Sequence, residues 1–366
     1  MKKTLLYIFL VLITLLILFN PQLTIDNAKA SLKLCYEVII PSLFPFFVCS
    51  GLLIYSGFLN SLSGVFKPLM KPLFNVSGSG AIAFILGIIS GYPLGALTVC
   101  QLYEGGYITK EEAERLLSFS NNSGPLFILG SVGVSLYHSL HLGIILYVSH
   151  LLSALTVGII MRNYKKSYFT PETSTLSTKS ENLGQIFSKV LTNSINSILT
   201  VSATIVFLSV ISRSILEILP ARGIVYSLVL GGMEFVNGIS DLSSLSIPLL
   251  LKLIFSSWIV GFAGFSVHLQ VMAIVSKYHL SLMPYIFGKI MQGIISCIYT
   301  FIIYSLTKPE LPAFSNSTIS YSFFASSLFV TLSVGFIVVI SVVPLIFSFI
   351  KKGIKLKKGI KNPSGL

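Results

Sequence analysis

The chain has 366 residues, of which 54% are apolar (Ala, Val, Ile, Leu, Met, Phe, Trp, Tyr or Cys) and only 10% are charged. Soluble domains carry roughly 25% charged residues, so this chain lacks the polar surface that a water-soluble fold needs. The composition indicates an all-α polytopic membrane protein and excludes secreted, cytosolic, fibrous and disordered classes. The net charge is +13, but the basic residues form short clusters between apolar runs. Such clusters orient membrane spans, so we expect no nucleic-acid partner.

The first apolar run, residues 5–19, ends at Asn20-Pro21. Ala28-Lys29-Ala30 resembles the small-x-small cleavage site of a signal peptide, which is one interpretation of this run. An uncleaved span is favoured, because the later segments insert into the membrane in any case. Region 1–37 is therefore predicted to be a first span followed by an external loop.

Further apolar segments follow along the chain. They are 38–58, 80–102, 119–137, 140–161, 190–218, 224–248, 249–276, 284–306 and 322–350. Two of them are interrupted, one by Ser90-Gly91-Tyr92-Pro93 and the other by polar residues between Glu234 and Asp241. Such interruptions in an apolar run indicate either a broken helix or a re-entrant hairpin.

The distribution of basic residues decides between these two possibilities, because cytosolic loops carry an excess of Lys and Arg. If both interrupted segments crossed the membrane, the basic cluster at 162–166 would be external. If both are re-entrant hairpins, that cluster is cytosolic, as are the N-terminal lysines and the basic tail 351–366. We therefore predict about eight full spans and two hairpins, with both termini in the cytosol.

Regions 38–161 and 190–306 present the same order of elements with opposite orientation: a span, a hairpin, an interrupted span and a span. A cytosolic linker rich in Ser and Thr, 162–189, joins them, and a last span lies in 307–350. Inverted repeats with discontinuous helices are typical of secondary transporters, whose site forms where the half-helix tips meet. The alternative is a protein whose glycines only allow close helix packing.

A polar connector, residues 103–117, follows the first interrupted segment. Thr109 with Glu112 three residues later predicts a capping box at the start of a short helix. We interpret the acidic cluster as a solvated helix face rather than as a metal site.

Motifs for ATP binding (G-x-x-x-x-G-K-[ST]) and for hydrolysis (H-E-x-x-H or G-x-S-x-G) are absent from the sequence, so we expect neither an enzyme nor a cofactor. The candidates for substrate binding are instead polar and glycine residues in the interruptions. They are Ser90, Gly91, Tyr92, Asn121, Asn122, Ser123, Ser266 and His268. Half-helix N-termini at these interruptions attract carboxylates. Alternatively, the two asparagines hold the bundle together by interhelical hydrogen bonds, and the histidine is a satisfied structural one.

Glu234, Asn237 and Asp241 are the candidates for binding a coupling ion, a proton or sodium, because intramembrane carboxylates are costly and usually functional. Alternatively, Glu234 is a protonated or Arg-paired structural residue, and Asp241 caps the second half-helix. Lys252 and Lys289 lie nearer the predicted span ends, and we interpret them as lysines that snorkel to the membrane surface.

The segments 90–96 (SGYPLGA) and 113–133 (AERLLSFSNNSGPLFILGSVG) closely resemble the sporulation integral membrane protein YlbJ family, also called SpoVV. Residues 41–47 and 67–74 add to the resemblance. That family belongs to the nucleoside-recognition, or Gate, domain group. Residues 261–266 (GFAGFS) resemble a motif of concentrative nucleoside transporters.

The resemblance implies a fold like that of the concentrative nucleoside transporters and a role in endospore formation. Members of the family are associated with moving dipicolinic acid from the mother cell towards the forespore, across the outer forespore membrane. The expected partners are thus a small aromatic dicarboxylate and the lipid bilayer, with a homo-oligomer left open. Two other functions also stay open: a nucleoside or nucleobase carrier, and a non-transporting scaffold for spore formation.

Overall fold

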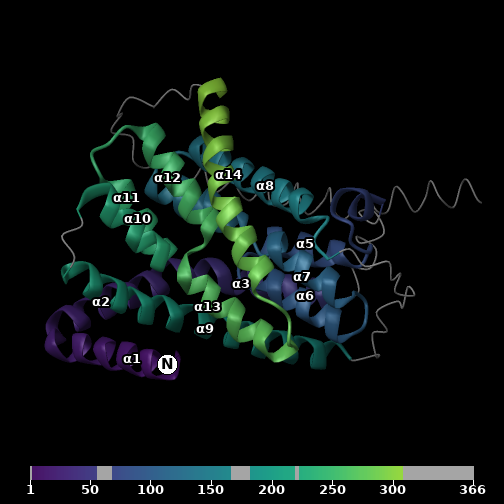
Figure 1. The fold of residues 1–366 in the computed structure, drawn as a ribbon, viewed down its shortest axis with the longest axis horizontal. Helices are drawn as coiled ribbons and strands as arrows, with labels where there is room; N and C mark the ends of the chain where they lie inside the picture. Colours follow the sequence, from purple (N-terminus) through teal and green to yellow (C-terminus); the bar gives the residue numbers. More distant parts are fainter. Residues whose placement is uncertain (1, 56–67, 166–181, 219–221, 308–366) are drawn as a thin grey trace, which may run out of the picture.

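A computed structural model describes residues 2–55, 68–165, 182–218 and 222–307, and every regular element in these ranges is a helix (Figure 1). Some of these helices are long and apolar enough to cross a membrane. They are Leu140–Met161, Leu183–Leu216, Leu249–Tyr278 and Met283–Thr307. The chain is therefore a multi-pass membrane protein, as its composition predicts. The predicted last span 322–350 and the basic tail lie outside the described residues.

The N-terminal region is helical where an external loop was predicted. Helix α1 (Lys2–Phe19) is followed directly by α2 (Pro21–Leu34), and the chain bends by 96° between them. Pro21 occupies the first position of α2, where its missing N–H costs nothing, so this proline begins a helix as well as ending one. A π-helical turn, η1 (Cys35–Ile39), continues α2 into α3 (Ile40–Tyr55).

Both interrupted segments form pairs of short helices that pack against each other. The first pair is α5 (Gly80–Ser90) with α6 (Leu94–Glu104), and the second is α10 (Gly223–Met233) with α11 (Phe235–Ser244). Both Gly87 and Gly95 lie so close to the carbonyl of Ser120 that a Cβ atom at either position would collide with it. The first pair therefore holds the C-terminal end of the next helix by direct backbone contact.

Each pair is followed by a helix that is broken in the middle. Helix α7 (Lys110–Ser120) and the π-helical η2 (Leu126–Leu136) flank the first break. Helices α12 (Leu249–Phe262) and α13 (Gly264–Val275) flank the second. At the second break Ala263 has a φ of 73° and Gly264 a φ of 65°. The order of elements is thus the same in both stretches, and their inverted relation stays a prediction.

The remaining long helices complete the bundle. Helix α8 (Leu140–Met161) follows the first broken helix, and α9 (Leu183–Ile218) begins inside the range predicted to be the linker. The short 3-10 helix η3 (Ser276–Tyr278) leads to α14 (Met283–Thr307). Figure 1 shows α14 running between α12 and α8, and both helices pack against it.

Helix α14 is polar inside and apolar outside. Its buried residues are Pro284, Tyr285, Gly288, Lys289, Gln292, Gly293, Ser296 and Thr300. Its exposed large side chains include Phe287, Ile290, Ile294, Ile298, Phe301 and Ile302. In lipid, apolar side chains face outward at no cost, while small residues let helices approach closely and polar ones bond across the contact. This helix therefore places polar groups in the middle of the bundle.

The polar connector forms α7, and the predicted capping box is confirmed. Thr109 Oγ1 accepts a hydrogen bond from Glu112 N at 3.2 Å, and Glu112 Oε2 accepts one from Thr109 N at 3.2 Å. The interpretation of the acidic residues as a solvated face is wrong for Glu112 and Glu114, which are buried. Their carboxylates bind backbone N–H groups, of Ser77 at 3.0 Å and of Ser281 at 3.1 Å respectively.

Arg115 explains why this part of α7 is buried, because it binds backbone carbonyls from two other segments. Its guanidinium donates to Tyr164 O at 2.8 Å, to Lys165 O at 2.6 Å and to Asn75 O at 3.0 Å. Glu114 Oε2 lies 3.0 Å from Lys165 Nζ, and this hydrogen bond raises the pKa of Lys165. Helix α7 thus ties the ends of several helices together at one end of the bundle.

Candidate functional site

The most unusual side chain in the bundle is Lys289 on α14, which is fully buried. Its Nζ donates a hydrogen bond to Gln292 Oε1 at 2.7 Å and lies 5.2 Å from the centre of the Tyr92 ring. The ion pairs found among the described residues, Lys33 with Glu37 and Lys165 with Glu114, do not include it. The interpretation that Lys289 snorkels is wrong, because it lies on the buried face of α14.

A chain of hydrogen bonds fixes the orientation of the Gln292 amide beside Lys289. Gln292 Nε2 donates to Asn122 Oδ1 at 2.9 Å and to the carbonyl of His150 at 3.4 Å. The backbone N–H of Ser123 donates to His150 Nε2 at 3.1 Å. Three segments far apart in sequence, the first break, α8 and α14, therefore meet at one buried polar cluster. We call Lys289, Gln292, Asn122 and His150 the lysine cluster.

The two adjacent asparagines of the first break have different roles. Asn122 is fully used, because its Oδ1 accepts from Gln292 and its Nδ2 donates to the Phe119 carbonyl at 2.7 Å. Asn121 accepts a weak hydrogen bond from Ala96 N at 3.4 Å, and its Nδ2 has no partner among the described residues. Interhelical bonding thus accounts for Asn122, whereas the Asn121 amide lies near the Tyr285 hydroxyl and has no partner for its Nδ2 at hydrogen-bond distance among the described residues.

The first hairpin tip packs directly on this break. A Cβ atom at Gly91, where φ is 81°, would lie 2.9 Å from Gly124 N. The hydroxyl of Tyr92 donates to the carbonyl of Val260 at 3.0 Å, which holds the ring below Lys289. Ser90 is buried, and its hydroxyl has no partner in the described part of the chain. The structure therefore brings the predicted residues of tip and break together.

Several buried polar atoms around the breaks have no hydrogen-bond partner in the described ranges. They are Ser90 Oγ, Ser120 Oγ, Asn121 Nδ2, His150 Nδ1, Ser266 Oγ and His268 Nε2. Buried polar groups in folded proteins are almost always paired, with protein, water or a ligand. Unpartnered donors and acceptors at the two breaks are groups that a polar ligand would satisfy.

His268 approaches the lysine cluster from α13. Its Nδ1 lies 2.7 Å from the carbonyl of Gly264, and its ring centre lies 5.2 Å from that of Tyr285 on α14. Because a carbonyl only accepts, Nδ1 carries the proton, and in the neutral ring Nε2 is an acceptor. His268 thus offers the interior an acceptor, whereas Asn121 offers a donor.

Glu234 lies at the second tip, where it caps α11. Its carboxylate accepts hydrogen bonds from Val236 N at 3.1 Å, from Asn237 N at 2.7 Å and from Asn237 Nδ2 at 2.7 Å. The proposal that Asp241 caps this half-helix is wrong, because Asp241 lies within α11 and accepts from Ser227 Oγ at 2.6 Å. Whether these carboxylates bind a coupling ion stays a prediction.

Further bonds tie the second tip to α9. Asn237 Nδ2 donates to Ser209 Oγ at 3.2 Å, and Arg213 Nη2 lies 3.4 Å from Asn237 Oδ1. The two tips touch through aromatic rings, since the Tyr92 and Phe235 ring centres are 5.9 Å apart. The carboxylate group at the second tip and the lysine cluster at the first are thus separate polar networks joined by an aromatic contact.

Sequence reasoning missed Gln292 and His150, and it placed Lys289 at the membrane surface instead of in the interior. A signal for two of them exists in α14, where polar residues recur at positions 289, 292, 296 and 300. Spacings of three and four residues place them on one face of a helix. A polar stripe on an otherwise apolar span predicts a face turned towards the protein interior. His150 has no comparable signal, because its partner Ser123 is brought near only by the fold.

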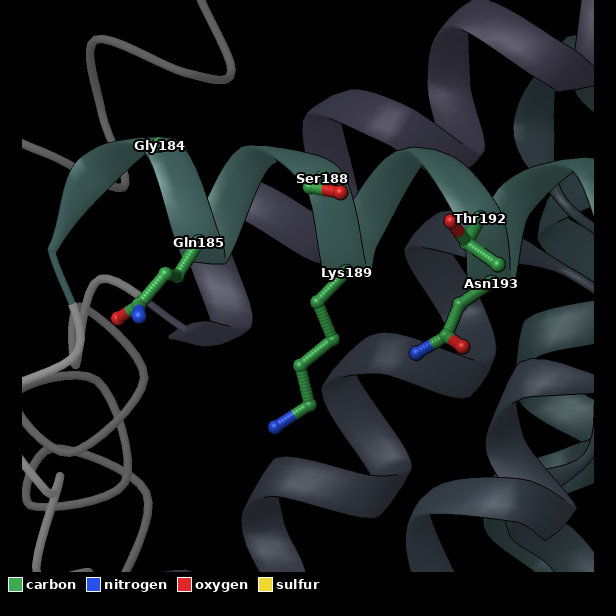
Figure 2. Close-up of a pocket in the computed structure, with 6 residues that line it drawn as sticks. All are labelled: Gly184, Gln185, Ser188, Lys189, Thr192 and Asn193. Carbon is green, nitrogen blue, oxygen red and sulfur yellow. The ribbon is translucent and has the colours of Figure 1, made fainter.

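A groove of about 480 Å³ lies along the N-terminal part of α9 (Figure 2). It is lined by Gly184, Gln185, Ser188, Lys189, Thr192 and Asn193. Figure 2 shows Gln185, Lys189 and Asn193 extending from the same side of this one helix. Binding sites for small molecules are concave and have converging polar groups from several elements. The groove lacks that arrangement and contains none of the predicted site residues.

Comparison with known proteins identifies one curated relative. Over 332 residues the chain is 31% identical to the sporulation integral membrane protein YlbJ of Bacillus subtilis (strain 168), and the match covers 81% of each chain. No family model matches the chain, so membership of the nucleoside-recognition group stays a prediction. No solved structure matches it either.

Proposed function

Because this chain belongs to the family of the sporulation integral membrane protein YlbJ, we propose that it is a secondary carrier for a small aromatic dicarboxylate in sporulation. The proposed substrate is dipicolinic acid, moved from the mother cell towards the forespore across the outer forespore membrane. The substrate, the membrane and the direction come from the family resemblance. The chemistry of the site supports the class of substrate.

The observation that carries the proposal is the buried Lys289 without an acidic partner in the described residues. A buried ammonium group is costly unless an anion or several hydrogen bonds compensate it. Gln292 and the ring of Tyr92 provide a partial compensation only. A carboxylate of the substrate supplies the missing negative charge, so the cluster favours an anionic substrate over a neutral nucleoside.

The surroundings of the lysine cluster also suit a planar, polar substrate. Among the described residues, the Ser90 hydroxyl at the first tip and the Asn121 Nδ2 at the first break are unpartnered, and the Tyr92 ring lies 5.2 Å from Lys289 Nζ. Breaks in helices leave backbone groups for a ligand, and such breaks form the sites of secondary transporters. The paired short helices and the broken helices described above thus support a carrier in which the site is exposed to each side in turn.

The first experiment measures dipicolinate in spores that carry the parent chain, Lys289→Met or Lys252→Met. Lys252 is the matched control, because its Nζ donates to the carbonyl of Ser243 at 2.7 Å and it lies outside the lysine cluster. We expect spores with Lys289→Met to contain at least about tenfold less dipicolinate than spores with the parent chain, because the substrate loses a charged hydrogen-bond partner. Spores with the control variant should contain the parent amount. Equal amounts of both variants in the membrane fraction show that insertion is unaffected.

Uptake into vesicles that contain the purified chain separates a carrier from a scaffold. We expect labelled dipicolinate to enter, and excess unlabelled nucleoside not to compete with it. Vesicles that take up no dipicolinate would support the scaffold, and competition by nucleoside would support the nucleoside carrier.

A further inference from the structure

We propose that Lys289 is also the proton-coupling group of the carrier, so that each substrate anion is transported together with one proton. This inference rests on the proposed function. In it, Lys289 is a neutral amine in the empty carrier and becomes an ammonium ion when the anion binds. The proton joins the lone pair of Nζ from the water on the entry side and leaves to the water on the exit side.

The empty site offers Lys289 no negative charge in the described part of the chain. Among the described residues, the carboxylates of the bundle interior are held elsewhere. Glu234 caps α11, Glu114 binds Lys165 and Ser281, and Glu112 binds the backbone N–H groups of Ser77 and Thr109. An ammonium ion at position 289 would therefore have no counter-ion in the empty carrier, and a buried lysine without a counter-ion gives up its proton.

Histidines and tyrosines surround Lys289 on the elements that pack against α14. The His150 carbonyl on α8 accepts from Gln292, the partner of Lys289. The His268 ring on α13 contacts Tyr285, one turn before Lys289 on α14. Lys289 Nζ also lies over the ring of Tyr92. These histidines and tyrosines are not anions near neutral pH. On the other packed elements, Arg115 of α7 binds backbone carbonyls, and Lys252 of α12 donates to Ser243. The immediate surroundings therefore favour the neutral amine.

The site suits both protonation states of Lys289. Because Asn122 and the His150 carbonyl take the N–H groups of Gln292, its Oε1 is turned towards Nζ. A neutral amine and an ammonium ion can both donate to that oxygen. The ammonium ion retains further N–H groups for a carboxylate. The cluster can thus hold the side chain in place while its charge changes.

The consequence for transport is a fixed coupling between anion and proton. The empty carrier reorients without a buried charge. The loaded carrier reorients with the ammonium ion paired to one carboxylate of the substrate, whose second carboxylate is left to Asn121 Nδ2 and Ser90 Oγ, the donors without a partner among the described residues. Reorientation with the ammonium ion alone, or with the dicarboxylate and a neutral amine, is disfavoured, because it would bury more uncompensated charge in the membrane. Proton and anion therefore move in the same direction, and an alkaline destination compartment draws the anion in.

The test uses the full chain in vesicles and measures two processes, with dipicolinate as the probe. Exchange is the swap of labelled external for unlabelled internal anion, and it needs only the loaded carrier. Net uptake is driven by a vesicle interior more alkaline than the medium. For the parent chain we expect both processes, together with a rise of external pH when anion is added. This pH signal requires no variant.

The decisive variant is Lys289→Arg, because arginine stays charged in proteins and cannot form the neutral empty carrier. We expect the ratio of its net uptake to its exchange to fall at least about tenfold relative to the parent chain. Because both rates are measured on the same vesicles, this ratio is independent of any effect of the larger side chain on anion binding. Lys252→Arg is the matched control and should retain both processes. Lys289→Met should lose both.

The outcomes distinguish the two proposals. Absence of exchange in the parent chain would overturn the proposed function itself. Exchange in the parent without a rise of external pH, or with uptake that ignores the pH gradient, overturns proton coupling at Lys289 and leaves the carrier intact. Full gradient-driven uptake by Lys289→Arg overturns it as well. If that variant does not fold, the pH signal of the parent chain alone decides.

Discussion

At the scale of single residues, the adjacent Asn121 and Asn122 have different roles. Asn122 has both ends of its amide in hydrogen bonds, whereas Asn121 has an unpartnered Nδ2. In the sequence the two asparagines are adjacent residues of the same polar interruption. Either one could bind a ligand or form the interhelical hydrogen bonds that hold the bundle together. The difference arises because only Asn122 meets Gln292, 170 positions further along the chain.

Replacing each asparagine by leucine should separate these roles. Asn122→Leu leaves Gln292 Nε2 and the Phe119 carbonyl with fewer partners, which costs about 1–3 kcal/mol, so we expect lower thermal stability and little transport. Asn121→Leu should keep a melting temperature near that of the parent and weaken the apparent affinity for the anion. Thermal unfolding in detergent and uptake at several substrate concentrations measure the two effects. Equal losses of stability in both variants would contradict the assignment.

Glu234→Gln tests whether the cap carboxylate couples an ion. The amide oxygen can keep the two Asn237 donors, but the NH₂ group then faces Val236 N, so we expect a loss of about 0.5–2 kcal/mol of stability, as for other helix caps. Uptake driven by a pH gradient should persist, because proton coupling is assigned to Lys289. Loss of the pH dependence with an unchanged melting temperature would instead place the coupling at Glu234.

At the scale of elements, contacts too close for any side chain fix the first hairpin. The backbone of α5 and α6 reaches the carbonyl at the end of α7 through Gly87 and Gly95. The sequence indicates where this hairpin turns, because Gly91 and Pro93 punctuate an apolar run. The sequence does not indicate that Gly87 and Gly95 allow a close backbone contact with α7. That contact becomes visible only once the three helices are packed together.

Gly87→Ala should therefore disrupt the hairpin, because the added Cβ collides with the Ser120 carbonyl. Forcing a methyl group into a packed contact costs typically about 1–3 kcal/mol, so we expect a lower melting temperature and less folded protein in the membrane fraction. Gly130→Ala is the control, since the nearest atom to its new Cβ is Leu126 Cδ1 at 3.7 Å. A similar loss in both variants would show that the contact is not the cause.

At the scale of the whole molecule, the sequence predicts the class of fold and the places where helices break. The apolar run 140–161 agrees with the bounds of α8, because the polar residues Ser139 and Arg162 on either side of it are the helix caps. The helix α2 was missed, since its Asp, Lys and Asn residues look like those of a loop. The lysine cluster was missed because it depends on the pairing of α14 with α7 and α8. Periodicity within one segment does not encode that pairing.

The predicted orientation of the chain can be tested by labelling introduced cysteines from outside intact cells. In a variant without native cysteines, we expect Ser139→Cys to react with an impermeant thiol reagent and Lys358→Cys and Lys166→Cys to be shielded. The last two positions lie outside the described residues. Labelling of position 166 from outside would exclude the arrangement with two re-entrant hairpins.

The length of α9 has a consequence for how the protein sits in its bilayer. Its 36 residues extend about 54 Å at the usual rise per residue, whereas the hydrocarbon layer is about 30 Å thick. A tilt of about 20°, which is usual for membrane helices, accounts for little of this difference in length. About four turns of the helix must therefore stand among the lipid headgroups or beyond them. The N-terminal turns around Lys189 are the polar ones, and Val190 and Ser194 are buried there. We therefore expect that end of α9 to lie at the membrane surface, packed against the rest of the protein.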